Sequence, residues 1–138
     1  MNTISTLGHT EAQRAIAAMQ TEIERRGKAA VIVVADPYGE LIALLRMDGA
    51  PLPSITIAMN KAYTAARKGE PTYELGRKVR DPEKGFDIAY YGDPRFVGWG
   101  GGLPVKVNGQ VVGAVAVSGL PEAEDMEVAM VGVKMITG

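Results

Sequence analysis

The chain has 138 residues, of which 46% are hydrophobic and 22% are charged, and its formal net charge is −1. This length and balance predict one globular domain over residues 1–138 that buries a core without disulfide or metal cross-links. With no cysteine and one histidine the usual zinc sites are excluded, and the balanced charge gives no reason to expect a nucleic-acid partner.

The first residues and the apolar stretches of the chain predict where in the cell the protein is located. Residues 1–6 lack the basic segment and apolar run of a signal peptide. The longest apolar stretches, such as residues 29–35, are too short to span a bilayer. We therefore expect no membrane partner and a cytoplasmic location.

The first predicted element is a helix over residues 11–26. Its apolar residues recur at three- and four-residue spacing, as on one face of a helix: Ala12, Ala15, Ile16, Met19 and Ile23. Thr10 and Gln13 fit an N-terminal capping box, and Gly27 ends the helix.

Two strands follow, over residues 30–36 and 40–47. The three residues between them, Pro37-Tyr38-Gly39, form a connection short enough for a hairpin. The first strand is almost wholly apolar, which predicts a central place in the sheet with both faces covered.

A second helix is predicted from Ser54 to Lys68, with a short third helix over residues 72–79. Residues 80–93 are charged and rich in Gly and Pro, which predicts a long loop of the kind that is often functional or mobile.

The remaining segments predict strands and a final helix. Residues 96–99, 103–107 and 110–118 read as strands, the last two joined by Asn108-Gly109, a strong signal for a type I′ hairpin turn. The helix that begins at Pro121 is more apolar than one core face requires, so we expect a homo-oligomer that packs through this C-terminal helix. The order of elements predicts an α+β fold, with a mainly antiparallel five-stranded sheet flanked by helices.

Two blocks of residues carry a family resemblance. They are Arg46-Met47-Asp48-Gly49-Ala50 with Ser54 and Lys61-Ala62, and Gly101-Gly102-Leu103-Pro104-Val105 with Val111-Val112-Gly113-Ala114-Val115 and Val117-Ser118-Gly119. Together they resemble the GlcG/HbpS-like family, which is also similar to the C-terminal domain of PduO. The resemblance implies a profilin-like fold and assembly into dimers or higher oligomers. It also implies haem or corrinoid binding, which several members show, or a place beside enzymes that degrade small organic compounds.

The glycine run Gly98-Trp99-Gly100-Gly101-Gly102 has two interpretations. A nucleotide-binding loop would need a helix directly after it, but a strand follows here, so no nucleotide is expected. The run forms either a tight bend in the sheet or a nest of backbone amides that binds a carboxylate.

A polar set near the second helix also has two interpretations. In the structural one, Ser54 caps the helix while Arg46 and Asp48 form a weak ion pair. In the functional one, Arg46 grips a carboxylate through two hydrogen bonds and Lys61 adds charge or acts as an acid.

Glu124 and Asp125 follow the last strand. They either interact with the dipole of the final helix or act as a general base against the glycine run. The only histidine, His9, fits a solvated position ahead of the first helix, and no Ser-His-Asp triad is legible. Tyrosine or methionine could still bind haem iron, so the cofactor stays open between haem, a corrinoid and none.

We interpret these residues as one site of a catabolic enzyme, a hydrolase, deaminase or isomerase, acting on a small carboxylated metabolite such as a ring-cleavage product. Lys61, Glu124 and Asp125 would move protons in that site. The substrate-binding candidates are Arg46, Asp48, Ser54, Gly100, Gly101, Gly102 and Ser118. The alternatives are a haem- or corrinoid-binding protein and a non-catalytic oligomeric accessory protein.

Overall fold

The computed structural model describes residues 1–138 and has the elements that the sequence predicts, with one exception. In chain order they are α1 (His9–Arg25), β1 (Val31–Ala35), β2 (Leu41–Arg46), α2 (Ser54–Lys68), α3 (Thr72–Val79), the 3-10 helix η1 (Ile88–Tyr91), β3 (Gly102–Val107), β4 (Gln110–Ser118) and α4 (Glu122–Thr137). None of these helices combines the length and the apolar character that crossing a lipid bilayer requires.

The four strands form one antiparallel sheet in the order β2-β1-β4-β3. Strand β1 is central and all five of its residues are buried, as its apolar sequence predicts. Its first residue, Val31, pairs with Arg46 of β2 on one side and with Ser118 of β4 on the other. The carboxyl ends of β2 and β4 therefore lie at the same end of the sheet.

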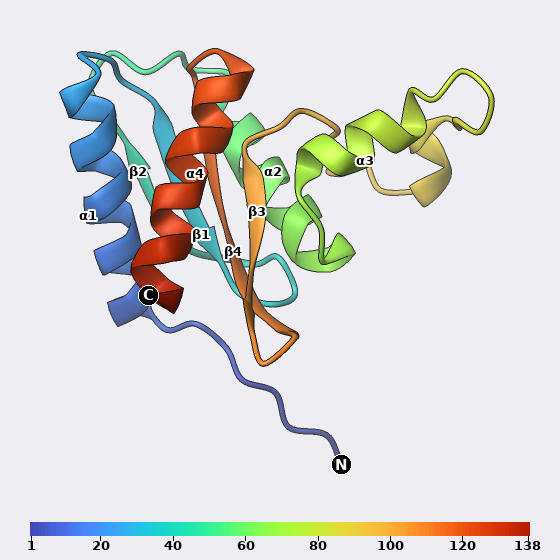
Figure 1. Ribbon diagram of the computed structural model, residues 1–138, viewed down its shortest axis with the longest axis horizontal. Coiled ribbons are helices and arrows are strands. Elements are labelled where there is room, and N and C mark those ends of the chain that lie inside the picture. The colour runs from blue at the N-terminus through green and yellow to red at the C-terminus, as the bar shows by residue number, and fades with distance from the viewer.

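Helices cover both faces of the sheet, so the fold is α+β with a layer on each side (Figure 1). Helices α1 and α4 pack on one face, where Ile32 and Val34 of β1 join the larger core cluster. Helix α2 packs on the other face with its alanines, against Val31, Val33 and Ala35. The small alanine side chains allow α2 to lie close to the strands, which positions its polar residues at the sheet end.

The β3–β4 hairpin confirms the predicted turn. Asn108 has a φ of 52° and Gly109 a φ of 77°, the pair of positive values that a type I′ turn requires. The turn aligns β3 with β4 so that Gly102 pairs with Ala116.

The predicted fifth strand was wrong, because the sheet has four strands. The backbone of residues 96–99 bonds to a side chain of α2 instead of to a strand: the Val97 N–H donates to Thr64 Oγ1 at 3.1 Å, and the Thr64 hydroxyl donates to the Arg95 carbonyl at 3.2 Å. This segment therefore runs along α2 and brings Trp99 and Gly100 to the end of the sheet.

The predicted cap of α1 was also wrong. The N-cap is Gly8, whose N–H donates to the Glu11 carboxylate at 2.7 Å, so Thr10 and Gln13 lie inside the helix. Leu7 fixes this start, because its side chain is buried and its N–H donates to the Val112 carbonyl of β4 at 2.8 Å.

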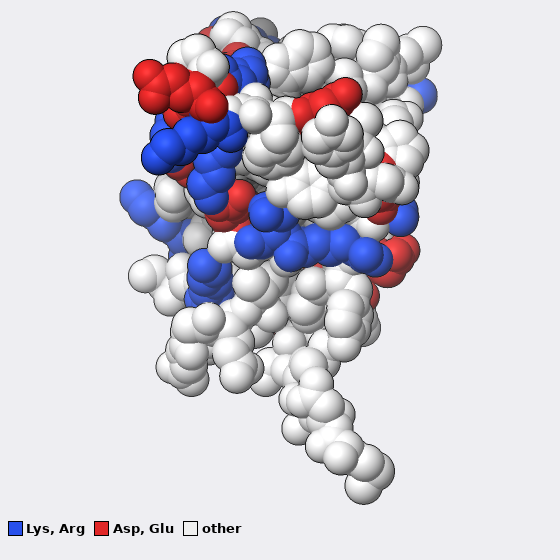
Figure 2. Space-filling view, turned by 90° about the vertical axis from the view of Figure 1, so that its right-hand side faces the viewer, with Lys and Arg blue, Asp and Glu red and all other residues white.

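The segment predicted as a long loop projects from the body with α3 and contains η1 (Figure 1). It is attached to α2 by aromatic contacts: Tyr91 stacks on Phe96 at 4.6 Å, and the Phe96 ring meets Tyr63 edge to face at 5.6 Å. Seen from the side of this projection, Lys and Arg side chains form a band across the surface with Asp and Glu side chains beside it (Figure 2).

Candidate functional site

A cavity of about 370 Å³ lies at the end of the sheet where β4 ends and where α2 and α4 begin. Its lining comes from four segments of the chain and consists of Ser54, Ile57, Lys61, Trp99, Gly100, Ser118, Gly119, Leu120, Glu122 and Asp125. The structure therefore brings together five predicted site residues, which are Ser54, Lys61, Gly100, Ser118 and Asp125.

The central polar feature of the cavity is a buried ion pair. The Lys61 ammonium of α2 donates to Oδ2 of Asp125 in α4 at 3.0 Å and to the Val117 carbonyl at 3.0 Å. The other Asp125 oxygen accepts the Leu120 N–H at 3.1 Å. The two side chains are only 2% and 4% exposed, so both charges lie almost completely out of water.

The glycine run lets Lys61 reach a helix on the opposite face of the sheet. A methyl group at Gly101 would lie 2.8 Å from Lys61 Nζ, 2.7 Å from the Val117 carbonyl oxygen and 2.9 Å from Asp125 Cβ. Gly101 also has a φ of +124°, which residues with a side chain rarely adopt. Its missing side chain leaves the space through which the amine passes the start of β3.

Burial moves both groups of the pair toward their neutral forms. Loss of water lowers the pKa of the Lys61 amine, against the opposing effect of Asp125. Loss of water likewise raises the pKa of Asp125 to about 6, although Lys61 and the Leu120 N–H favour its carboxylate. The pKa values of Lys61 and Asp125 are therefore closer together than those of the two groups in water. Shifted pKa values of this kind are common at functional sites.

Two serines line the same cavity without a partner in the chain. Ser54 and Ser118 are each 4% exposed, and neither hydroxyl makes a hydrogen bond within the structure. The prediction that Ser54 caps α2 was wrong, because Pro53 occupies the N-cap and Ser54 lies inside the first turn. Both hydroxyls are therefore free to bond to a molecule in the cavity.

The lining of the cavity also contains apolar residues and an exposed acidic residue. Trp99, the only tryptophan, is 57% exposed and lines the cavity with Ile57 and Leu120. Glu122 accepts the Gly100 N–H at 2.8 Å. Lys61 is the only cation of the lining, and Asp125 already neutralises it.

The amide nest predicted for a carboxylate is largely used within the chain. The Gly100 N–H donates to Glu122, and the Gly102 N–H donates to the Thr72 hydroxyl at 3.0 Å. The Gly101 carbonyl accepts the Val117 N–H at 3.0 Å. Gly101 and Gly102 do not line the cavity, and the run forms a tight bend at the start of β3.

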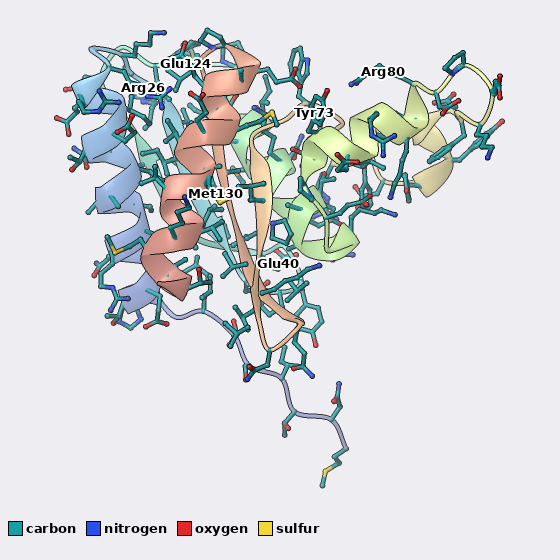
Figure 3. The ribbon with its side chains drawn as sticks, in the orientation of Figure 1. Arg26, Glu40, Tyr73, Arg80, Glu124 and Met130 are labelled. Atoms are coloured by element: carbon teal, nitrogen blue, oxygen red, sulfur yellow. The ribbon has the colours of Figure 1, made fainter.

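Glu124 lies away from the cavity. It accepts hydrogen bonds from Lys28 at 2.7 Å and from Arg26 at 3.4 Å, which ties the start of α4 to the end of α1 (Figure 3). These cations lower the pKa of Glu124, so it is a poorer base than an ordinary glutamate. These contacts give Glu124 a structural role, and its predicted part in proton transfer stays a prediction.

Arg46 and Asp48 line a different cavity of about 330 Å³, together with Glu24 and Lys28 of the α1 end. Both are exposed, and no ion pair joins them. Arg46 and Lys61 line separate cavities, so the expectation that they grip one ligand stays a prediction. Arg46, the last residue of β2, lines this cavity next to residues from the end of α1.

Sequence reasoning missed a second polar cluster on α2. The Tyr63 hydroxyl bonds to Asp93, and the Arg95 guanidinium donates to both Tyr63 and Asp93. Arg95 and Arg67 also lie against the Tyr63 ring, at 3.9 and 4.4 Å from its centroid. These bonds hold the pKa of Asp93 well below its usual range. No spacing in the sequence signals contacts between residues 30 positions apart.

Side chains that commonly bind metal ions are dispersed. No three of the His, Cys, Asp or Glu side chains gather closely enough to hold a metal ion. His9 is the first residue of α1 and is exposed, remote in sequence from every segment that lines the cavity.

Comparison with protein families finds one matching model, described as "Haem degrading protein HbpS-like", over residues 7–134. Among curated proteins, GlcG of Escherichia coli K12 is 36% identical over 118 residues, which cover 86% of this chain and 85% of that protein. An uncharacterized 15.0 kDa protein of Citrobacter freundii is 34% identical over 116 residues, covering 84% of this chain and 82% of that one.

Solved structures share the same fold. Protein ORFY of Klebsiella pneumoniae superposes with a TM-score of 0.95 at 30% identity, covering 100% of this chain and 95% of that one. A variant of Streptomyces reticuli HbpS gives 0.88 at 27% identity, over 99% and 90% of the two chains. A complex of PduOC with haem gives 0.88 at 24% identity, over 95% of each chain, a level that speaks for the fold alone.

Proposed function

This chain belongs to the HbpS-like family, as its two motif blocks predict, and on that premise we propose that it binds a small organic ligand in the cavity between α2, α4 and the end of β4. The observation that carries the proposal is the pair of hydroxyls of Ser54 and Ser118, which belong to nearly buried residues of the cavity lining, bond to nothing in the chain and stay accessible. Each hydroxyl can donate one hydrogen bond and accept two, and a ligand or water in the cavity can use them.

A tetrapyrrole, haem or a corrinoid, is the first ligand class to test, because the family description names haem. A cavity of about 370 Å³ is at the low end of the roughly 300–1,000 Å³ range of ligand pockets. A macrocycle would therefore lie across the mouth of the cavity, against the exposed Trp99 ring and the side chains of Ile57 and Leu120. Such contact between flat rings contributes about 0.5–1.5 kcal/mol.

The cavity does not fit the iron of haem. Its lining contains no His, Cys, Met or Tyr, the side chains that commonly bind haem iron. It also contains no cation that is free to pair with a propionate, since Lys61 is bound to Asp125. We therefore propose a macrocycle held by apolar contact and assign no iron ligand in this cavity.

The proposal is tested by titrating the full-length protein with hemin, metal-free protoporphyrin and cobalamin, following the absorption of each ligand. Saturable binding of hemin and protoporphyrin with similar affinity is expected, and Trp99→Leu should weaken both by roughly two- to tenfold. His9→Ala is the matched control and should change neither. The absence of saturable binding for all three ligands, or affinities that Trp99→Leu leaves unchanged, would contradict the tetrapyrrole proposal.

A second candidate function is catalysis on a small metabolite, and the pair of Lys61 and Asp125 at the cavity wall favours it. A buried carboxyl with a pKa of about 6 can accept and return a proton near neutral pH. Hydrolase, deaminase or isomerase chemistry stays a prediction of the sequence, and the carboxylated substrate loses its support because Arg46 lies in the other cavity.

Assembly into a homo-oligomer through α4 also stays a proposal. Met130 and Met135 of α4 are 42% and 45% exposed, and Figure 3 shows Met130 on the outer side of this helix. A second copy of the same face is the partner we propose. Light scattering on the purified protein should show a mass above that of one chain, and Met130→Glu should lower it. A monomeric wild-type protein would exclude this interface.

A further inference from the structure

Lys61 combines burial with access to the cavity. An ammonium group has three hydrogens, and the chain supplies two acceptors for them, Asp125 Oδ2 and the Val117 carbonyl, each at 3.0 Å. The side chain is only 2% exposed, and Lys61 is one of the residues that line the cavity. The amine therefore lies at the cavity wall, while bulk solvent is almost excluded.

A purely structural role explains the pair poorly. Removing two charges from water costs several kcal/mol per ion, and two apolar side chains would pack the same space at no such cost. The bend at Gly101 also packs closely on the pair, since a side chain there would collide with the Val117 carbonyl oxygen, Lys61 Nζ and Asp125 Cβ. Both features are expected where an amine is needed at the cavity wall.

From this geometry we infer that Lys61 is a nucleophile that condenses with the carbonyl carbon of a small uncharged aldehyde or ketone in the cavity, forming a Schiff base. The inference rests on the proposed function only in taking the cavity as the ligand site. It adds a covalent step and a second class of ligand to that site. Asp125 acts as the acid and base of the step because it touches the reacting nitrogen.

The step balances without an oxidant or reductant. The Lys61 ammonium first gives a proton to Asp125, and the nitrogen lone pair then bonds to the carbonyl carbon while the C=O π pair moves to oxygen. That oxygen takes the proton from Asp125 and becomes a hydroxyl. The nitrogen then gives one of its own protons to the Asp125 carboxylate. Asp125 passes this second proton to the hydroxyl, which leaves as water while the nitrogen lone pair forms the C=N bond. The product is a protonated Schiff base beside the Asp125 carboxylate, so the charge of the original pair is restored.

The surroundings of the pair favour this chemistry. Burial lowers the pKa of Lys61 and raises that of Asp125, so the neutral amine needed for attack costs less than it does for a lysine in water. Removal of water also favours the condensation, which releases a water molecule.

The remaining lining indicates the ligand class. The free hydroxyls of Ser54 and Ser118 can bond to oxygen atoms of the ligand, and Trp99 and Leu120 provide an apolar wall. No unpaired cation is present, and Glu122 at the rim would repel an anion. A neutral hydroxylated carbonyl compound fits these features better than a carboxylate does.

The test uses dihydroxyacetone, a small uncharged ketone, with sodium cyanoborohydride to reduce any Schiff base to a stable amine. After brief labelling of the full-length protein at neutral pH, peptide mapping by mass spectrometry compares Lys61 with the exposed Lys84 and Lys106. Lys61 should label faster than either exposed lysine, because burial lowers its pKa and so raises the fraction of neutral amine. Labelling of Lys61 no faster than that of Lys84 and Lys106 would overturn the inference.

Two variants sharpen the test. Asp125→Asn should slow labelling of Lys61 while Lys84 and Lys106 label as before, and equal rates would remove Asp125 from the step. Ser118→Ala, which breaks no bond within the chain, should also slow Lys61 labelling if the ketone occupies the cavity. The two proposals fail separately: tetrapyrrole binding without Lys61 labelling overturns only the Schiff base, and Lys61 labelling without tetrapyrrole binding overturns only the macrocycle.

Discussion

The Lys61 ammonium and the Asp125 carboxylate, 64 residues apart in the chain, lie 3.0 Å apart at the end of the sheet. Their helices cover opposite faces, and the glycine bend at the start of β3 leaves the passage between them. The pair connects helices α2 and α4 and also lies in the wall of the cavity, so substitutions in it should affect both the stability of the fold and the chemistry of the cavity.

Removing one partner of the pair should destabilise the protein strongly. Asp125→Ala leaves the Lys61 charge and the Leu120 N–H without their acceptor, and breaking a buried pair in this way costs about 3–5 kcal/mol. Urea unfolding followed by circular dichroism measures the loss.

Two controls accompany this substitution. Glu74→Ala breaks an exposed pair with Arg77 and should change the free energy of unfolding by no more than about 0.5 kcal/mol. Replacing both partners, as in Lys61→Met with Asp125→Leu, should recover much of the loss because no charge is left unpaired. An Asp125→Ala protein as stable as the wild type would show that the pair does not contribute to the fold.

The pair should also make stability depend on pH in a recognisable direction. The pKa of Asp125 is about 6 in the folded protein and 3.8 for an ordinary aspartate, so between these values the folded state holds the proton more tightly. The contribution of this group to stability is therefore complete below about pH 4 and is lost as the pH rises through about 6. Half-buried carboxylates with a lowered pKa, such as Glu22 and Glu124, act in the opposite direction.

The difference between wild type and Asp125→Asn isolates that effect. The charged groups facing Asp125 are Lys61 of α2 and Glu122 of α4, and both remain in the variant. Urea unfolding at several values from pH 4 to 7 should show the stability advantage of wild type shrinking as the pH rises. An advantage that grows over this range would mean that Asp125 is ionised throughout, with its pKa lowered by Lys61.

Gly101→Ala tests how closely the bend packs against the pair. The substitution requires an alanine at a φ of +124°, and its methyl group would lie 2.7 Å from the Val117 carbonyl oxygen and 2.8 Å from Lys61 Nζ. Gly109→Ala is the matched control, because Gly109 also has a positive φ, of 77°, but nothing lies within 4 Å of the added methyl group. The control should cost about 1–2 kcal/mol for the backbone conformation alone. Gly101→Ala should cost clearly more and should slow labelling of Lys61, and equal costs for the two would contradict the packing argument.

The sequence predicted the helices and strands well wherever their signals are local. Helix α2 begins and ends at the predicted Ser54 and Lys68, because its alanines repeat with helical spacing and Gly69 follows. The fifth strand failed because the hydroxyl of Thr64, more than 30 residues earlier, binds the backbone of residues 95–97. Spacing along the chain carries no information about such a partner.

The candidate site was predicted in part for the same reason. Lys61, Ser118 and Asp125 entered the prediction separately, and only the packing of α2 and α4 on opposite faces shows that they meet. Arg46 sits level with Ser118 in the sheet, since both pair with Val31, but lines another cavity. Glu124 differs from Asp125 by one position, a rotation of about 100° on a helix, and so binds α1.

Substitution of the cavity serines should separate ligand binding from stability. The Ser54 and Ser118 hydroxyls bond to nothing in the chain, so Ser54→Ala and Ser118→Ala should leave the free energy of unfolding unchanged or slightly higher. Each should weaken a ligand that bonds to the hydroxyl by about 0.5–1.5 kcal/mol, measured by calorimetric titration.

Two further variants show that these effects belong to the cavity. Thr72→Val removes a hydroxyl that accepts the Gly102 N–H at 3.0 Å, so it should lower stability by about 1–3 kcal/mol, because a buried N–H is left unpaired. Arg46→Ala, in the other cavity, should leave both stability and ligand affinity as they are in the wild type. Ligand affinity that falls with Arg46→Ala and not with Ser118→Ala would move the binding site to the other cavity, which Arg46 lines and Ser118 does not.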